Sequence, residues 1–203
     1  MQKPNGYDEA QTSGEFTPVE LGGHYAVIKQ VSERQSSTGK DMIVVLFDFI
    51  LPDQQAGYFQ KSFEGDTRDD KKWPFNGSKY IMVKDYNDPT RTSRAFKTFC
   101  TCFERSNNCS VNWGGSSWGT QFKGKKIGVV FGAEENEYDG RISMRHVPKW
   151  FCSWDAVKDA KVPNPKYLNG TGPAPQSQNT QDTSKQIDGF LSIPDGLDEE
   201  IPF

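Results

Sequence analysis

The sequence predicts a mainly β fold: a five-stranded barrel with one helix between its third and fourth strands, followed by a disordered acidic tail. Three observations predict this organisation. Short segments rich in β-branched and aromatic residues recur between turn residues. One segment, after residue 88, places apolar side chains at helical spacing instead. Beyond Pro163 large apolar side chains almost vanish, so that part of the chain buries too little surface to offset its ordering entropy.

The first two strands form a predicted hairpin. Residues 22–35 alternate β-branched and aromatic with polar side chains, and Gly39 lies in the turn that follows. Residues 41–51 are a long apolar run that stops at Pro52, which is typical of a strand buried on both faces. We expect a third strand at residues 57–65, where two sets of side chains alternate.

The middle of the chain predicts a loop and then a helix. Residues 66–87 mix charges with Trp-Pro and indicate a long loop with a partial strand at residues 79–86. Asp88 can cap the helix with Pro89 at its first position, and "RSNN" ends it. Apolar side chains at spacings of three and four form its predicted buried face: Phe96, Phe99, Cys100 and Phe103.

A second hairpin completes the predicted fold. Residues 122–136 form the fourth strand, "EYDG" turns the chain, and residues 141–151 form the fifth strand. Ser153 is a candidate cap for a short final helix. Five strands with a helix between the third and fourth is the element order of the oligonucleotide/oligosaccharide-binding (OB) barrel, and the predicted fold class is therefore an OB-type barrel.

The charge is divided along the chain. The part beyond residue 160 holds three lysines and six carboxylates, for a net charge of −3, which equals that of the whole chain. Residues 58–149 hold 16 Lys and Arg against 11 Asp and Glu. A basic middle beside an acidic end indicates nucleic-acid contact. The predicted organisation is an N-terminal arm (1–20), an OB-fold DNA-binding domain (21–160), a disordered linker (161–187) and an acidic partner-binding tip (188–203).

No motif predicts an enzyme. His24 and His146 are 122 residues apart, nucleophile-elbow, zinc-protease and Walker motifs are absent, and "DTRDD" is most simply a solvated loop. The spacing C-x-C-x6-C favours buried reduced cysteines over zinc, so we expect no metal and no cofactor. The sequence shows neither a signal peptide nor an apolar run of about 18 residues, which favours a cytoplasmic protein.

Basic and aromatic residues interleave, and this pattern predicts a groove for single-stranded nucleic acid. Cations replace the counterions of phosphates, and flat side chains stack on unpaired bases. The predicted stacking residues are Tyr58, Trp73, Phe75, Tyr80, Tyr86 and Trp150. The predicted phosphate contacts are Lys61, Lys71, Lys72, Lys79, Lys84, Arg141, Arg145 and Lys149.

The chain ends in "DEEIPF", which offers carboxylates and two apolar side chains to a partner that has an apolar pocket under a basic rim. The residues of this predicted tip are Asp198, Glu199, Glu200, Ile201, Pro202 and Phe203. The ending resembles the acidic tip of bacterial single-stranded DNA-binding proteins, behind a similar Gln/Gly/Pro-rich linker. "AFKTFCTCFERSN" and "FKGKKIGVVFGAEENEYDGRISMRHVPKWF" resemble phage and prophage single-stranded DNA-binding proteins of Gram-positive hosts.

The resemblance implies an OB-fold protein that coats single-stranded DNA in replication, recombination and repair, in the host cytoplasm or nucleoid if a bacteriophage encodes it. It also implies a tip that recruits replication, recombination or repair enzymes. The alternative is an adaptor of phage origin whose barrel binds a protein rather than DNA. Monomer and homo-oligomer, and DNA and RNA preference, stay open at this point.

Overall fold

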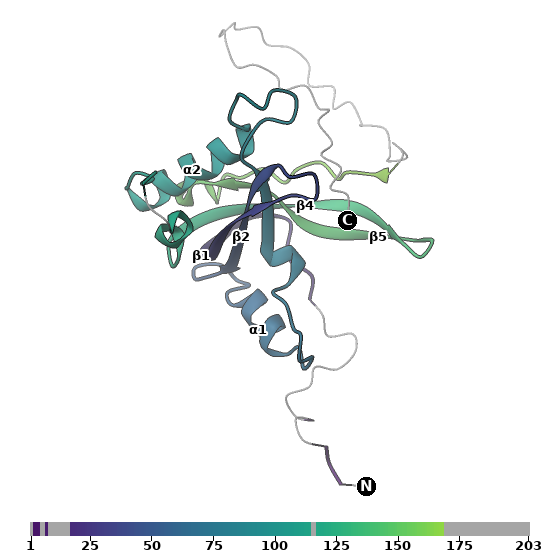
Figure 1. The fold of residues 1–203 in the computed structure, drawn as a ribbon. Coiled ribbons are helices and arrows are strands. Elements are labelled where there is room, and N and C mark those ends of the chain that lie inside the picture. Colours follow the sequence, from purple (N-terminus) through teal and green to yellow (C-terminus); the bar gives the residue numbers. More distant parts are fainter. Residues whose placement is uncertain (1, 5–6, 8–16, 115–116, 169–203) are drawn as a thin grey trace, which may run out of the picture.

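The computed structural model describes residues 2–4, 7, 17–114 and 117–168. Its fold is mainly β, with five antiparallel strands in one sheet of order β3-β2-β1-β4-β5 and two helices (Figure 1). The sheet is open: among the described residues β3 and β5 are its two edges. The strands are β1 (Gly22–Gln35), β2 (Asp41–Phe49), β3 (Ser78–Met82), β4 (Lys126–Tyr138) and β5 (Arg141–Cys152), and the helices are α1 (Tyr58–Glu64) and α2 (Arg94–Asn107).

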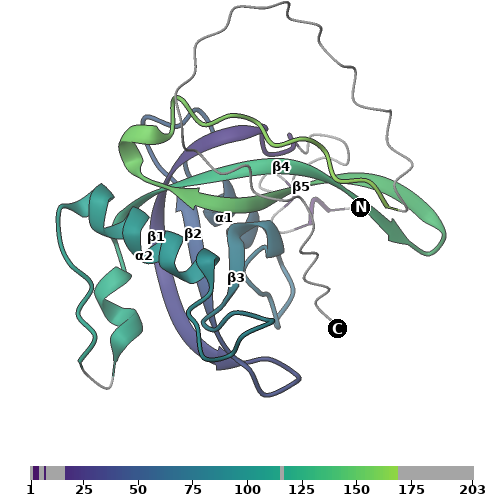
Figure 2. The ribbon, with the colours of Figure 1, turned by 90° about the horizontal axis from the view of Figure 1, so that it is seen from above.

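Both predicted hairpins are confirmed. β1 pairs with β2, and β4 pairs with β5, at positions that match the expected segments closely. On β2 the alternation places Val45 and Phe47 in the core, while Val44 and Asp48 are also buried on the opposite face. The β4–β5 hairpin is long and extends beyond the rest of the sheet in both views (Figures 1 and 2).

The predicted third strand at residues 57–65 is wrong, because this segment is helix α1. Phe59 and Phe63 are four residues apart, so the segment has helical as well as alternating spacing. The buried Asp48 carboxylate decides between them, since it accepts hydrogen bonds from the backbone N–H groups of Phe59 (2.9 Å) and Gln60 (3.2 Å). These groups lie in the first turn of the helix, where N–H groups have no intrahelical partner. The third strand is β3 instead, at the place of the predicted partial strand.

The single helix between the third and fourth strands is confirmed as α2, but its predicted start is wrong. Ser93 caps it, with Oγ accepting from the N–H of Phe96 at 3.1 Å. Asp88 forms an earlier turn, in which its carboxylate accepts from the N–H and hydroxyl of Thr90. Asn108 ends α2 in the left-handed conformation. The buried face is as predicted: Phe96, Phe99, Cys100 and Phe103.

Three short 3₁₀ turns complete the described elements: η1 (Phe75–Gly77), η2 (Trp118–Phe122) and η3 (Trp154–Ala156). η3 takes the place of the helix predicted after Ser153. A single aromatic-rich core joins the sheet, both helices and η2, with Phe47, Phe59 and Phe131 in mutual ring contact.

The segment 17–20 packs into the body. Val19 is 2% exposed and belongs to the core cluster. Side chains from α1, β1, β5 and the loop after β2 hold the segment. The Tyr58 hydroxyl donates to the Thr17 carbonyl, and the Gln55 side chain donates to the Pro18 carbonyl and accepts from the Glu20 N–H. The rings of His146 and His24 hydrogen-bond the carbonyls of Val19 and Glu20, respectively. η1, which directly precedes the edge strand β3, also contacts the other edge strand, β5. The segment 17–20 and η1 therefore both bridge from the α1 side of the molecule to β5.

The face of β1 and β4 that points away from the core is covered by the segment after β5. A Cβ at Gly23 would lie 2.2 Å from the Val157 carbonyl oxygen, and a Cβ at Gly128 would lie 2.6 Å from a Val157 methyl group. Glycine is therefore required for this close approach.

The predicted tip (188–203) and most of the predicted linker lie outside the described residues. Among those described, no helix is long and apolar enough to cross a bilayer, and no three potential metal ligands gather. Burial raises the pKa of the Cys100 and Cys102 thiols to about 11 and that of Cys152 to about 12.

Candidate nucleic-acid interface

The strand register divides the side chains of β2 and β3 between two faces. Ile43 pairs with Ile81, and both are buried in the core. Their neighbours Val44 and Tyr80 pair on the opposite face. Val44 is 6% exposed although it lies outside the core cluster, so other side chains of this outer face cover it. The outer face of β2 and β3 therefore has its own apolar surface.

Two predicted stacking residues lie together on this face. The rings of Phe75 and Tyr80 are 6.4 Å apart and nearly parallel, with an interplanar angle of 29°. Phe75 is 58% exposed and Tyr80 is 39% exposed. η1 holds Phe75 just before β3, because the Ser78 hydroxyl donates to the Phe75 carbonyl at 2.7 Å. Rings exposed in this manner contribute little to the core but offer flat surfaces to a base.

A pocket of about 290 Å³ adjoins Phe75 and brings three predicted residues together. Tyr58 of α1, Phe75 of η1 and Arg145 of β5 line it. Burial raises the pKa of the Tyr58 phenol, which donates a hydrogen bond to the Thr17 carbonyl at 2.8 Å. Arg145 is exposed and supplies the positive charge beside the two rings.

Trp73 is partly buried beneath η1. Its indole N–H donates to the Gly77 carbonyl at 2.9 Å, and its ring lies 5.7 Å from Phe63 and packs against the core. Lys29 lies 6.0 Å from the Trp73 ring and Lys71 lies 4.9 Å from the Phe63 ring. Trp73 therefore supports the turn that presents Phe75, and only part of its ring faces solvent.

Tyr86 lies beyond the other end of β3 and is exposed. The Lys40 ammonium, from the β1–β2 turn, lies 3.7 Å from the centre of the Tyr86 ring. Phe75, Tyr80 and Tyr86 thus follow one another before, within and after β3. Cations accompany aromatic rings at both ends of this strand.

The remaining predicted contacts are more scattered. Trp150 on β5 pairs with Val130, away from the core, and is partly exposed. Lys149 is held by Glu134 at 2.9 Å. Lys79 shares the core-facing side of β3 with Ile81. Four predicted phosphate contacts are exposed but lie on separate elements: in α1, in the loop before η1, after β3 and at the start of β5. These residues are Lys61, Lys72, Lys84 and Arg141, in that order.

The β4–β5 hairpin is not basic. Residues 134–145 hold four carboxylates and two arginines. Tyr138, Ile142 and Met144 are exposed on it.

In the loop after α1, Arg68 hydrogen-bonds Asp66 and holds the pKa of that carboxyl at about 2, so this guanidinium is engaged within the chain.

Three residues beside the predicted contacts are not among the residues that the sequence predicts for the site: Phe63, Lys29 and Lys40. The alternation of residues 57–65 predicts a strand, although the four-residue spacing of Phe63 from Phe59 also fits the helix that brings Phe63 to Trp73. Lys40 adjoins the β1–β2 turn, and only the fold brings it to Tyr86. No local signal marks Lys29, which lies at a β-bulge between Ile28 and Gln30.

No protein-family model matches the chain, and no curated protein matches it with a significant score. The arrangement of Phe75, Tyr80, Tyr58 and Arg145 is therefore the main basis on which its function is inferred.

Proposed function

We propose that this chain is a non-catalytic, sequence-tolerant single-stranded DNA-binding protein of the OB fold. The strand order supports the fold, since β1 lies between β2 and β4 and the sheet is open between β3 and β5. A five-stranded, partly open barrel of this kind binds oligonucleotides on its strand 2–3 face and through the loops that join strands 1–2 and 4–5.

The observation that carries the proposal is the exposed pair Phe75 and Tyr80 on the β2–β3 face, beside the pocket that contains Arg145. Every base has a flat face, so stacking on these rings tolerates any sequence. Lys40 beside Tyr86 and Arg145 beside Phe75 supply charge at the two ends of this surface. The proposed role is to coat single strands during replication, recombination or repair in the cytoplasm. The C-terminal tip, residues 198–203, recruits partner enzymes.

The test is a titration with labelled oligo-dT at low and high salt, with duplex DNA as control. Loss of one stacked base costs about 1–3 kcal/mol, so Phe75→Ala and Tyr80→Ala each weaken binding by about five- to 150-fold. Tyr7→Ala removes an equally exposed ring elsewhere and leaves affinity unchanged. Unchanged affinity in the double variant Phe75→Ala/Tyr80→Ala would refute the assignment of this face.

One observation favours the adaptor as a second candidate. The β4–β5 hairpin exposes Tyr138, Ile142 and Met144 among an excess of carboxylates, which suits a protein better than a polyanion. The adaptor predicts no saturable binding of oligo-dT at any salt concentration. The DNA-binding protein predicts binding that weakens as salt rises.

A further inference from the structure

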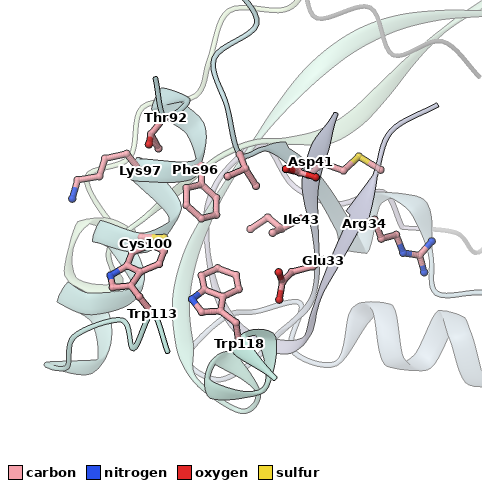
Figure 3. A pocket seen from close by; sticks show the side chains of 12 residues that line it. Glu33, Arg34, Asp41, Ile43, Thr92, Phe96, Lys97, Cys100, Trp113 and Trp118 are labelled. Carbon is pink, nitrogen blue, oxygen red and sulfur yellow. The ribbon is translucent and has the colours of Figure 1, made fainter. Parts of the chain in front are cut away.

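A larger cavity lies on the other face of the same strands. Its volume is about 660 Å³, within the range of about 300–1,000 Å³ typical of ligand pockets. α2, the turn end of the β1–β2 hairpin and the residues around η2 line it (Figure 3). Because Glu33 pairs with the core residue Ile43, these side chains lie on the face opposite to Tyr80.

Three aromatic rings form one side of the cavity. Trp118 is nearly parallel to both Phe96 and Trp113, with ring centres 5.8 Å apart and interplanar angles of 29° and 24°. Figure 3 shows these rings side by side along the opening. Phe96 is buried in the core, whereas Trp113 is 66% exposed. The faces of aromatic rings attract cations because the ring quadrupole is negative there.

Carboxylates face these rings. Glu33 points into the opening and Asp41 lies at its edge, whereas the charged ends of Arg34 and Lys97 point away (Figure 3). The alternation of β1 explains the difference, because Glu33 and Arg34 are consecutive and belong to opposite faces. Among the described residues no ion pair engages Glu33 or Asp41.

The Trp118 indole N–H is also unsatisfied. It is buried and has no hydrogen-bond partner within the described part of the chain, whereas the Trp73 N–H donates to a carbonyl. In Figure 3 the Trp118 nitrogen lies on the side toward the exposed ring of Trp113, so an acceptor from outside reaches it only when Trp113 moves aside. A ligand that fits this cavity therefore supplies a positive charge, a flat or apolar stem and a hydrogen-bond acceptor.

We propose that this cavity binds a basic side chain, arginine or lysine, of a partner polypeptide. The cation lies over Trp113 and Trp118 and opposes Glu33 and Asp41. The aliphatic stem covers apolar wall, and a peptide carbonyl beside it accepts from the Trp118 N–H. An acidic peptide or a phosphate would meet the two carboxylates, and a free inorganic cation would leave the N–H without an acceptor. The inference does not rest on the proposed function, because it uses different residues on the opposite face.

The test follows the indole N–H signals of the ¹⁵N-labelled chain by NMR during titration with N-acetyl-arginine amide. The signals of two of the five tryptophans, Trp113 and Trp118, are expected to shift together. The expected dissociation constant is in the millimolar range, because only one cation–π contact and two exposed ion pairs contribute to binding. N-acetyl-citrulline amide has the same shape without the charge and is expected to shift neither signal. Agmatine carries the guanidinium without peptide groups and is expected to bind more weakly.

Variants separate the contacts. Glu33→Gln, Asp41→Asn and Trp113→Ala each alter an exposed side chain and are each expected to weaken binding by about two- to fivefold. Glu137→Gln makes the same chemical change on the distant hairpin and serves as the matched control. Oligo-dT is expected to leave both indole signals unmoved.

Four results would overturn the proposal: no shift by arginine amide at tens of millimolar, equal shifts by citrulline amide, binding of agmatine as tight as that of arginine amide, or displacement by oligo-dT. The last result would assign the cavity to nucleic acid instead. Loss of oligo-dT binding in Phe75→Ala with intact arginine binding keeps the two sites separate, so failure of one inference is distinguishable from failure of the other.

Discussion

Replacement of Gly119 by alanine tests whether η2 is seated on β1, which is the contact that positions Trp118. A Cβ at Gly119 would lie 2.2 Å from the carbonyl oxygen of Val31 and 3.1 Å from its carbonyl carbon. Side-chain Cβ atoms essentially never approach within 3.0 Å of another group, so the turn has to retreat by about 0.8 Å. Both obstructing atoms belong to the backbone of a central strand, which cannot yield as a flexible side chain can.

The magnitude follows from two opposing effects. Overpacking of this kind costs about 1–3 kcal/mol and occasionally more. Loss of glycine freedom in the unfolded chain returns about 0.4–1 kcal/mol. Because the obstructing atoms are backbone, the overpacking cost lies in the upper part of its range, and after the return is subtracted we expect Gly119→Ala to lower the free energy of unfolding by about 1–2.6 kcal/mol. With a urea dependence of about 2 kcal/mol/M for a domain of this size, the unfolding midpoint falls by about 0.5–1.3 M.

The assay is urea unfolding followed by far-UV circular dichroism, with Gly114→Ala as the control. Gly114 lies five residues earlier in the same connection, and a Cβ there would meet only the Asn112 side chain, at 3.7 Å. The control is expected to match the wild type or exceed it slightly. If the Gly119→Ala midpoint coincides with that of Gly114→Ala, η2 is not seated on β1. The enclosure of the larger cavity by Trp118 would then lose its basis.

Further predictions concern single groups. Asp48→Ala removes the carboxylate that accepts from N–H groups at the start of α1, and is expected to cost about 2–4 kcal/mol of stability, measured by urea unfolding. Burial raises the pKa of Asp53, but hydrogen bonds from His24 and from two backbone N–H groups outweigh this effect, so the pKa of Asp53 is lowered on folding. The stability that the ionised Asp53 contributes is therefore present above a pH of about 4 and is lost as the pH falls further. Asp53→Asn is expected to reduce the loss of stability at acidic pH, measured by urea unfolding as a function of pH. Cys109 is exposed, whereas Cys100 is buried and Cys102 and Cys152 are partly buried. At pH 8 the native chain is therefore expected to react with a thiol reagent quickly at one thiol, and at all four in urea. Four fast thiols in the native chain would contradict the burial of Cys100 and the partial burial of the other two.

Most of the fold is local in origin, and for that reason it could be predicted. The hairpins and the buried face of α2 follow from spacings within single segments. α1 could not be predicted in this manner, because its sequence has both spacings. The Asp48 carboxylate that favours the helix lies eleven residues from Phe59 and reaches it only after β2 has formed. The start of α2 at Ser93 rather than Asp88 depends likewise on the Ser93 hydroxyl bonding the Met82 carbonyl of β3.

The candidate site was predictable by residue type and less so by grouping. Interleaved aromatic and basic residues selected Phe75, Tyr80 and Arg145, but their proximity depends on strand register and on the contact of η1 with β5. The same pattern predicts Trp73 as a stacking residue, yet its indole N–H donates to the Gly77 carbonyl and Trp73 supports η1 instead. Trp113 and Trp118 are not among the predicted site residues, since the Gly- and Ser-rich segment that contains them is typical of a loop. A tryptophan in such a loop was itself a signal of a surface that binds something.

The two proposed ligands carry opposite charges, although the net charge of the chain is small. Alternation along β1, β2 and β3 sends Tyr80 and Arg34 to one face and Glu33 and Asp41 to the other. A polyanion on the outer face and a basic peptide in the cavity would therefore contact different side chains. If both proposals hold, the two ligands do not compete, and the net charge of the chain predicts neither of them.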